Sequence, residues 1–443
     1  MTTYTKASIR LTSVSLMSLP PGRLLSLPVH TVGEPGQSLT ISFDQLRHAG
    51  AGQRPASWMA ISARLPMTVD PARIALAWQA VVNRHGSLRT AFSWSPRGEL
   101  ELHRMQVGFG EWAEHAEGGE DELRRGVRVL FDSTCAPFEQ PSHRLALVIP
   151  RADQTDQRPV VVIGSDHSHV DMWSMLVLLR DLVTALENLA QGREAGEGLT
   201  EVASFADHSA VMAARPPAPE HVHQRWAEIL DAGGGVMPRF GMDIGPGNPC
   251  VESDYEVRDI FDSAQRDLFA ERAGALGVRM IALAVSTLTA VSLGLSGQPL
   301  RAVFPVHSRY EPRWRDSVGW FITDSVIESN STDPQECSRA VKEAIELGSY
   351  PLAPILAPFG GLPIAPGMFA LSWLDTRRLV QLPAGSQVQY ISAAVHDTGV
   401  MVWFIVNDDG LHLRARYPAM PQARTAMGVW LDAVEEGLRG WLT

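Results

Sequence analysis

The sequence has few cysteines, almost no lysine and no long apolar run. Its three cysteines, Cys135, Cys250 and Cys337, lie far apart in no CxxC or Cys/His spacing, so neither a disulfide framework nor a structural zinc site is indicated. We expect them to be reduced thiols in a cytoplasmic protein. Only Lys6 and Lys342 stand beside thirty-six arginines, a skew that is typical of GC-rich codon usage.

The chain also lacks the positive charge of a nucleic-acid-binding protein. Its net charge is −11 over 443 residues, and no run rich in Lys and Arg opposes this balance. The first twenty-two residues alternate polar and apolar types without the apolar core of a signal peptide, which predicts an opening strand. The most apolar stretch, Met280 to Leu295, contains Ser and Thr and is shorter than the roughly 20 residues of a membrane span. We expect a buried helix there and no transmembrane segment.

The most informative stretch runs from Pro159 to Leu182. Residues 159–163 are apolar and β-branched and predict a buried strand, whereas residues 172–182 repeat apolar side chains at helical spacing. Between them, residues 164–171 read Gly-Ser-Asp-His-Ser-His-Val-Asp and bring two imidazoles and two carboxylates into six positions. Polypeptide between a strand and a helix commonly displays functional groups, so this hinge is the candidate site.

Spacing alone leaves three interpretations of the hinge open. His167 and Asp171 can form an HxxxD pair, in which a carboxylate orients a general base. His167, His169 and Asp171 can form an HxHxD metal cluster, as in metallo-β-lactamase-like hydrolases, or Asp171 can simply cap a helix. The metal pattern requires His at position 172, where this chain has Met, and the later histidines form no second ligand set by spacing. We therefore expect no metal site.

The remaining pattern predicts mixed strands and helices in two halves. The segment Arg215-Pro216-Pro217-Ala218-Pro219 cannot continue a helix, so we place an N-terminal lobe at residues 1–214 and a C-terminal lobe at residues 215–443. Residues 41–47 are expected to lead into a turn-rich segment. We expect helices at 71–84, 120–131, 172–190, 204–214, 226–231, 263–274, 280–295 and 422–438, and strands at 58–65, 100–107, 143–148, 159–163, 254–260, 301–306, 368–375, 388–394, 399–407 and 411–417.

Five segments, in order, resemble the superfamily of condensation domains and chloramphenicol-acetyltransferase-like acyltransferases. Residues 42–45 (SFDQ) resemble its opening motif, residues 84–90 (RHGSLRT) its RHExLRT segment, and residues 166–174 (DHSHVDMWS) its HHxxxDGxS loop. Arg309 followed by residues 318–321 (VGWF) resembles its R…VGxF block, and residues 372–377 (SWLDTR) its SYxDxR block. The resemblance covers the chain from about residue 41 onward. Within the superfamily, it is strongest to the polyketide-associated (Pap-type) acyltransferases of actinobacteria.

This resemblance implies an α/β fold of two chloramphenicol-acetyltransferase-like lobes that face each other across a central substrate tunnel. It also implies an acyltransferase that moves an acyl group from a thioester to a hydroxyl or amine in lipid, polyketide or peptide natural-product biosynthesis. His167 would be the general base, and Asp171 would hold the loop by pairing with Arg309. No serine or cysteine lies in a nucleophile motif such as GxSxG, so we expect direct transfer without an acyl-enzyme intermediate.

Further residues enter the site through the resemblance. Gly319 is expected to support it, and either a backbone N–H near the hinge or the hydroxyl of Ser372 is the candidate donor to the thioester oxygen. The residues expected to contact substrate are Asp166, Ser168, Met172, Trp320 and Ser372. Two of them depart from the family pattern, since Asp166 replaces a first histidine and Met172 replaces a glycine and adds bulk. We expect a monomer with no permanently bound cofactor, whose donor substrate is a phosphopantetheine thioester, either coenzyme A or a carrier protein.

Two other functions remain open. A stand-alone condensation enzyme that forms an amide would differ from an ester-forming one only in its acceptor. A catalytically inactive condensation-like domain that recruits a carrier protein or partner enzyme is a different class of function, and the two departures, Asp166 and Met172, motivate it. The sequence identifies neither the acyl donor nor the acceptor.

Overall fold

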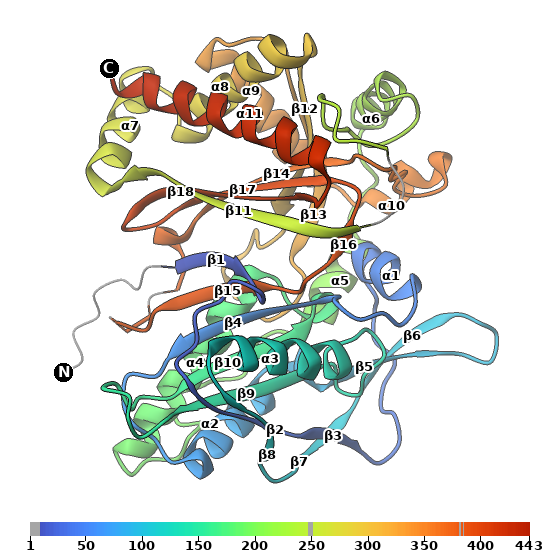
Figure 1. Cartoon of the computed structure of the whole chain (residues 1–443). Coiled ribbons are helices and arrows are strands. Elements are labelled where there is room, and N and C mark those ends of the chain that lie inside the picture. The colour runs from blue at the N-terminus through green and yellow to red at the C-terminus, as the bar shows by residue number, and fades with distance from the viewer. Residues whose placement is uncertain (1–8, 247–250, 381, 384) are drawn as a thin grey trace. The chain divides into compact units, whose positions relative to one another are not determined.

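The computed structural model describes residues 9–246, 251–380, 382–383 and 385–443, and the described residues form two compact units (Figure 1). The first unit comprises Met1–Ala214, Arg309–Phe321 and Arg378–Ala394, and the remaining segments form the second. The predicted boundary after residue 214 coincides with one passage between the units. The prediction of a continuous C-terminal lobe is wrong, because two later segments belong to the first unit.

A seven-stranded sheet lies at the centre of the first unit. Strand β10 (Val160–Asp166) runs antiparallel to both of its neighbours, and all seven of its residues are buried, which explains the near-continuous apolar run in its sequence. The other strands, given in sheet order with β10 between β4 and β9, are β1 (Ile9–Ser13), β15 (Val388–Ser392), β4 (Trp58–Arg64), β9 (His143–Pro150), β2 (Gly22–Leu27) and β8 (Ala113–Gly118). The predicted opening strand is confirmed as β1, and residues 1–8 lie outside the described part.

Strand β15 reaches this sheet from late in the chain. It lies between β1 and β4, parallel to the first and antiparallel to the second. The sequence predicts a strand at these residues but assigns it to the C-terminal lobe, which is wrong. Strand β15 brings Tyr390 into the first unit, where its hydroxyl contacts the start of the helix that follows β10.

The helices of the first unit begin at clear capping signals. They are α1 (Phe43–Gly50), α2 (Pro71–Arg84), α3 (Glu120–Thr134), α4 (Met172–Ala190) and α5 (Phe205–Ala213). In Figure 1, α3 lies in front of the strands of the sheet, and it contacts β2, β8 and β9. Residues 41–47 are expected only to lead into a turn-rich segment, but residues 43–50 form α1, which Ser42 and Gln45 start with a capping box.

Two short two-stranded sheets accompany this sheet. The strand predicted at residues 100–107 is two strands, β6 (Leu100–Arg104) and β7 (Gln106–Phe109). Strand β6 pairs with β5 (Thr90–Trp94), and β7 pairs with β3 (Val29–Val32). One predicted strand therefore belongs to two different ladders, which its sequence pattern does not reveal.

The second unit contains another seven-stranded sheet, with helices against one face. Its strands, in sheet order, are β13 (Ile322–Ser329), β12 (Leu300–His307), β14 (Phe369–Asp375), β17 (Val400–Val406), β18 (Gly410–Pro418), β11 (Val251–Asp262) and β16 (His396–Asp397). Its helices are α6 (Glu220–Ala232), α7 (Ser263–Ala275), α8 (Met280–Ser296), α9 (Pro334–Leu347), α10 (Leu352–Leu356) and α11 (Pro421–Arg439). Figure 1 shows α7, α8, α9 and α11 on one side of this sheet, and a single apolar core fills the space between. Strand β13 and helix α9 were not predicted.

Helix α8 is buried along most of its length, as its composition predicts. Within the described ranges, no single helix has the length and apolarity to cross a membrane. Helices α7 and α8 meet that criterion only as a pair, and they are bent by 91°.

Cys135 and Cys337 are buried free thiols, and Cys250 lies outside the described residues.

Candidate active site

The candidate site forms where strand β10 ends and helix α4 begins. Strand β10 ends at Asp166, and one 3₁₀ turn, His167–His169, leads to the helix. A carboxylate caps each side of this turn. Asp166 accepts the N–H of Ser168 at 2.9 Å, and Asp171 accepts the N–H of Ser174 at 2.6 Å. The two aspartates therefore fix the backbone on both sides of the first imidazole.

Asp171 forms a buried ion pair with Arg309, as predicted. One guanidinium nitrogen, Nη2, donates to both carboxylate oxygens at 3.0 and 3.2 Å, and neither side chain is more than 2% exposed. The N–H of Phe321 donates to the same carboxylate at 3.1 Å. The other terminal nitrogen of Arg309 donates to the carbonyls of Trp314 and Ser317. A buried charge is tolerated when it is paired and hydrogen-bonded, so this pair fixes the start of α4.

Gly319 supports the same contact from the neighbouring segment. Its N–H donates to the hydroxyl of Ser174 at 3.0 Å, and its carbonyl accepts from that hydroxyl at 2.9 Å. Arg309 donates to the same hydroxyl at 2.8 Å. A Cβ atom at position 319 would lie 2.3 Å from the side chain of Phe205, so only glycine fits here.

The imidazole of His167 lies against Trp320. The two ring centroids are 4.2 Å apart with 32° between the planes. The residue is half-buried, and its Nδ1 is shielded from solvent and makes no hydrogen bond in the described structure. Burial lowers the pKa of His167 from its ordinary value of 6.5, and the nearby Asp166 and Asp171 only partly oppose this shift. The ring is therefore neutral at pH 7, the form in which it can accept a proton.

Asp166 and Ser168 do not have the substrate contacts predicted for them. Both side chains are fully buried, and the Ser168 hydroxyl donates to Asp166 Oδ1. The other carboxylate oxygen accepts the hydroxyl of Ser57 at 2.6 Å and Nε2 of His48 at 3.2 Å. Each oxygen of Asp166 thus accepts two hydrogen bonds from the chain, which leaves no free group for a ligand. Asp166 anchors the turn, and its predicted role as a substrate-binding residue is wrong.

The other three residues predicted to contact substrate lie in different environments. Met172 is the half-buried first residue of α4, and its carbonyl accepts the hydroxyl of Tyr390 at 2.5 Å. Its backbone is helical, so methionine in place of glycine requires no strained conformation. Trp320 is half-buried against His167. Ser372 is half-buried on β14 of the second unit, and its contact with substrate stays a prediction.

The side chains of the alternative metal cluster point to different partners. His169 is buried, and its Nδ1 lies 3.3 Å from the hydroxyl of Thr90. Asp171 forms an ion pair with Arg309, and the ring of His167 packs against Trp320. Among the described residues, no group of three His, Cys, Asp or Glu side chains is placed to hold a metal ion. The geometry therefore favours the HxxxD interpretation over the HxHxD one.

Sequence reasoning missed two side chains that support the hinge, His48 and Arg54. His48 is on α1, and its ring meets that of Trp320 edge to face at 5.2 Å. Arg54 follows in the loop after α1 and donates to Nδ1 of His48 at 2.9 Å. The capping box at Ser42 and Gln45 is a sequence signal for α1, and a helix there would have brought His48 to attention. No local pattern predicts its contact with Asp166, which is 118 residues away.

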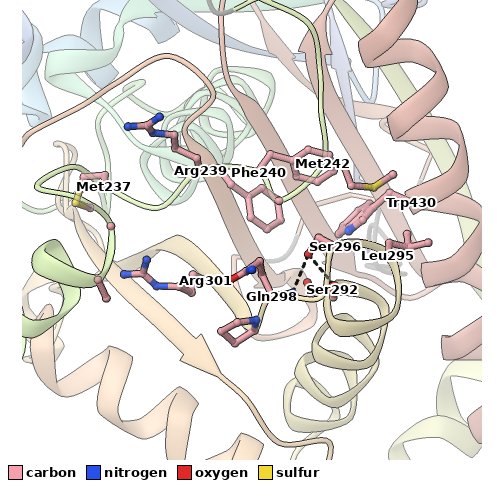
Figure 2. A pocket seen from close by; sticks show the side chains of 15 residues that line it. Met237, Arg239, Phe240, Met242, Ser292, Leu295, Ser296, Gln298, Arg301 and Trp430 are labelled. Atoms are coloured by element: carbon pink, nitrogen blue, oxygen red, sulfur yellow. Dashed lines mark hydrogen bonds between the residues drawn. The ribbon is translucent and has the colours of Figure 1, made fainter.

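A separate pocket of about 360 Å³ lies within the second unit (Figure 2). Figure 2 shows Arg239 and Arg301 on one side of it and Phe240, Met242 and Trp430 on the other. Its lining contains no His, Cys, Asp or Glu side chain. This pocket therefore offers no general acid or base, in contrast to the hinge.

A protein-family model matches most of the chain. The model of the condensation domain matches residues 48–347. Among curated proteins, the isonitrile lipopeptide synthase of Mycobacterium tuberculosis is 26% identical over 299 residues, which is 63% of this chain and 11% of that protein. The nonribosomal peptide synthetase NPS2 of Ceriporiopsis subvermispora is 28% identical over 159 residues, 34% of this chain and 6% of that protein. The chain thus spans only a small part of these relatives.

Solved structures resemble the chain over nearly its whole length. A PapA2 acyl transferase has a TM-score of 0.83 at 17% identity and covers 98% of this chain and 99% of its own. The first condensation domain of the CDA synthetase has a TM-score of 0.73 at 14% identity and covers 92% of this chain and 97% of its own. At these identities the likeness establishes the fold, which confirms the predicted mixed α/β architecture of this superfamily.

Proposed function

The chain belongs to the condensation-domain family, and we propose that it is an acyltransferase in which His167 acts as the general base. One observation carries the proposal. The imidazole of His167 is neutral and half-buried and forms no ion pair with another described residue, while the turn beneath it is fixed by the buried pair of Asp171 and Arg309. This is what a general base requires, because it must be unprotonated and held in one place when the nucleophile arrives.

The proposed reaction transfers an acyl group directly. The hydroxyl or amine of the acceptor attacks the thioester carbonyl, and its proton passes to Nε2 of His167. The bond between the acyl carbon and sulfur then breaks, and the imidazolium returns the proton to the departing thiolate. One acyl–oxygen or acyl–nitrogen bond forms, one free thiol is released, and the enzyme is restored. General-base help of this kind is worth roughly 10² to 10⁴ in rate.

The neighbouring residues have supporting parts in this proposal. Asp171 and Arg309 hold the loop and do not exchange protons with substrate, since each is committed to the other and to backbone groups. Trp320 covers one face of the imidazole and limits its rotation. Ser372 remains our candidate donor to the developing oxyanion.

The donor is proposed to be a phosphopantetheine thioester, carried by coenzyme A or by an acyl or peptidyl carrier protein. The names of the relatives support this class of chemistry, since they include peptide synthetases and an acyl transferase. The protein itself would need no permanently bound cofactor, because the imidazole and the backbone supply the groups that the reaction uses.

The test measures thiol release from acetyl-, octanoyl- and palmitoyl-coenzyme A with alcohol and amine acceptors, and identifies products by mass spectrometry. His167→Ala should lower the rate of acyl transfer by about 10² to 10⁴. His103→Gln is a matched control, because His103 is another histidine of the first unit and its ring lies 3.1 Å from Glu101 on its own strand, β6. We expect it to keep the wild-type rate.

The same assay separates the alternatives. Amide products in preference to esters would identify a stand-alone condensation enzyme, the reading that the synthetase relatives favour. Equal rates for wild type and His167→Ala would contradict the proposal and favour a condensation-like domain that recruits a carrier protein without catalysis.

A further inference from the structure

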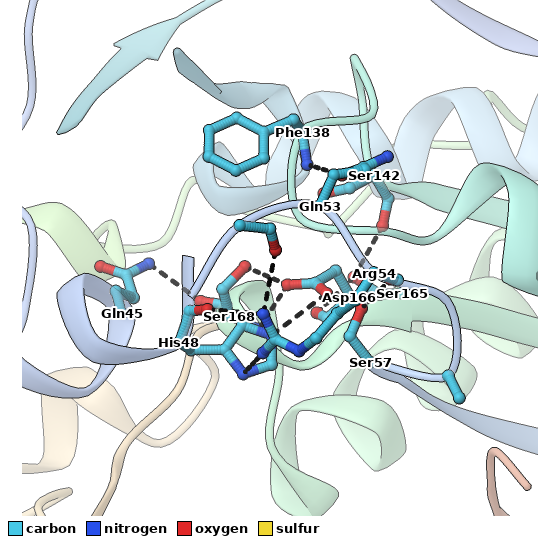
Figure 3. A network of polar contacts seen from close by, with 12 residues as sticks. Gln45, His48, Gln53, Arg54, Ser57, Phe138, Ser142, Ser165, Asp166 and Ser168 are labelled. Carbon is cyan, nitrogen blue, oxygen red and sulfur yellow. Dashed lines mark hydrogen bonds and ion pairs between the residues drawn. The ribbon is translucent and has the colours of Figure 1, made fainter. Parts of the chain in front are cut away.

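The turn that carries His167 is held on its strand side by the side chains of His48, Arg54 and Ser57, which come from another part of the first unit (Figure 3). Figure 3 draws His48 together with Arg54 and Asp166, and dashed lines mark the contacts among them. Nε2 of His48 lies 3.2 Å from Oδ2 of Asp166, and Nη2 of Arg54 lies 2.9 Å from Nδ1 of His48. The guanidinium and the carboxylate therefore do not meet directly, because an imidazole separates them.

This arrangement fixes the protonation of His48. A guanidinium has only N–H donors and keeps its proton at any pH the protein meets, so Nδ1 of His48 must accept the bond from Arg54. Nε2 must then carry the single ring proton and donate it to Asp166. His48 is thus a neutral imidazole in one tautomer, and it transmits the charge of Arg54 to the buried carboxylate.

Both ends of this bridge are anchored. Nη1 of Arg54 donates to the carbonyls of His48 and Gly52 at 2.8 and 3.0 Å, which holds the guanidinium in place. Asp166 has no exposed surface and accepts the hydroxyl of Ser57 as well. Although burial alone raises it, hydrogen bonds from His48, Ser168 and Ser57 lower the pKa of Asp166 to about 2, so the carboxylate is ionised at neutral pH.

The loop that supplies these groups also holds the backbone of His167. The carbonyl of Ser57 accepts the N–H of His167 at 3.0 Å. Ala56, the preceding residue, has a φ of +59°, a conformation that a non-glycine residue adopts only when its surroundings impose it. Its N–H donates to Asp132 at 3.1 Å. The loop is therefore a constrained support for the turn.

We propose that His48 is a positioning residue for His167, acting as a neutral bridge that couples the guanidinium of Arg54 to the carboxylate of Asp166. The bridge holds the carboxylate that caps the turn, and the turn holds the imidazole. His48 does not reach His167 itself, since their ring centroids are 6.4 Å apart, and its second contact with the base passes through Trp320. The inference rests on the proposed function of His167 as base.

Two substitutions of His48 separate its polar bridge from its ring contact. His48→Gln offers a carbonyl to Arg54 and an amide N–H to Asp166, so the bridge can persist while the ring is lost. His48→Phe keeps a ring beside Trp320 but can neither accept from Arg54 nor donate to Asp166. His103→Gln is again the control, because its partner is Glu101.

The first measurement determines the chemical reactivity of His167 in the absence of substrate. Diethyl pyrocarbonate acylates neutral imidazoles, and peptide mass spectrometry at pH 7 gives the rate at His167 alone. Displacement of the turn changes the exposure of this ring. We therefore expect the rate to change at least fivefold in His48→Phe, to stay within twofold of wild type in His48→Gln, and to be unchanged in His103→Gln. A wild-type rate in His48→Phe, or equal changes in both His48 variants, would overturn the proposal.

The second measurement reads the tautomer of His48 by ¹⁵N NMR of protein labelled at histidine, with His48→Gln used to assign the signal. At pH 7.5 we expect Nε2 to be protonated and Nδ1 to be a bare acceptor. A doubly protonated ring or the opposite tautomer would refute the bridge. These results are independent of acyl transfer, so a failure of the bridge and a failure of His167 as base are distinguishable. His167→Ala addresses only the second question.

Discussion

Two buried aspartates, five positions apart, flank the candidate base, and they are neutralised in different ways. Asp171 pairs directly with Arg309, whose side chain is 1% exposed. Asp166 reaches its cation, Arg54, only through a neutral imidazole, and Arg54 is half-buried. Both carboxylates cap the backbone beside them. The turn is therefore fixed on its helix side by an ion pair and on its strand side by a network of hydrogen bonds.

The difference indicates which side tolerates change. Removing one partner of a buried ion pair leaves an uncompensated charge, whereas Asp166 keeps the donors Ser57 and Ser168 if its bridge is broken. We expect substitutions on the Arg309 side to be costlier to stability than those on the Arg54 side. Both sides act on the same imidazole, so both should alter its reactivity.

The largest effect is expected for Arg309→Met. It leaves Asp171 buried without its cation, which should lower the free energy of unfolding of the first unit by about 3–5 kcal/mol. Urea unfolding at pH 7 measures this loss. Arg313→Met is the control, because Arg313 forms an exposed pair with Glu311 that is worth about 1 kcal/mol or less. A loss no larger than that of the control would show that the pair at Asp171 does not stabilise the turn.

Arg54→Met should have the next largest effect. It tests directly whether the two sides of the turn differ in their contribution to stability. It removes the charge-assisted bond to His48 but leaves all four hydrogen bonds that Asp166 accepts, so we expect a loss of about 1.5–3 kcal/mol. The same urea titration measures it. A loss that equals or exceeds that of Arg309→Met would contradict the expectation that the Arg309 side contributes more to stability.

Acid should weaken the strand side in a defined range. The pKa of Asp166 is lowered to about 2 from an ordinary value of 3.8, so its stabilising contribution is present above pH 3.8 and is lost as the pH falls towards 2. The shift corresponds to about 2 kcal/mol. The stability of wild type and Asp166→Asn should therefore converge between pH 5 and 2.5 in urea unfolding. A constant difference over this range would contradict the ionised state of Asp166.

Tyr390→Phe should have the smallest effect. It removes one hydroxyl that donates to the carbonyl of Met172 at the start of α4, and a lost hydrogen bond of this kind costs about 1 kcal/mol. The thermal unfolding midpoint measures the change. A decrease in the free energy of unfolding of more than 3 kcal/mol would contradict this expectation. It would mean that the Tyr390 hydroxyl also holds β15 in the sheet.

Local sequence patterns predict the elements around the hinge well. Helices α2 and α4 begin and end where their sequences indicate, because each combines apolar periodicity with a capping aspartate. Strand β10 follows from its continuous apolar run. Local sequence does not determine which of the two sheets β15 joins, because strands of the same composition suit either sheet. Helix α1 escaped prediction because it is short and mostly polar, and only its capping box indicates it.

The residues of the candidate site also fall into those that the sequence predicts and those that it does not. His167 stands out because two imidazoles and two carboxylates crowd one hinge, and family resemblance alone suggested Arg309 as the partner of Asp171. His48 and Arg54 reach the site through the antiparallel pairing of β4 with β10, which brings Trp58 opposite Asp166. Such pairing over about a hundred residues has no sequence signal in a single chain. The prediction that Asp166 contacts substrate failed for this reason, because its partners were unknown.

The pH dependence of kcat/KM for thiol release tests the central claim, that His167 acts as a neutral base, most directly. The titratable groups that face this imidazole are Asp166, Asp171 and His48, and of these only the two aspartates carry charge when His48 forms its neutral bridge. Because burial lowers the pKa of His167, the rate should be at its plateau at pH 7 and fall through a single ionisation below pH 6.5. The ionisation should be absent from the residual rate of His167→Ala. A profile that is flat from pH 5 to 7.5, or the same ionisation in His167→Ala, would contradict the claim.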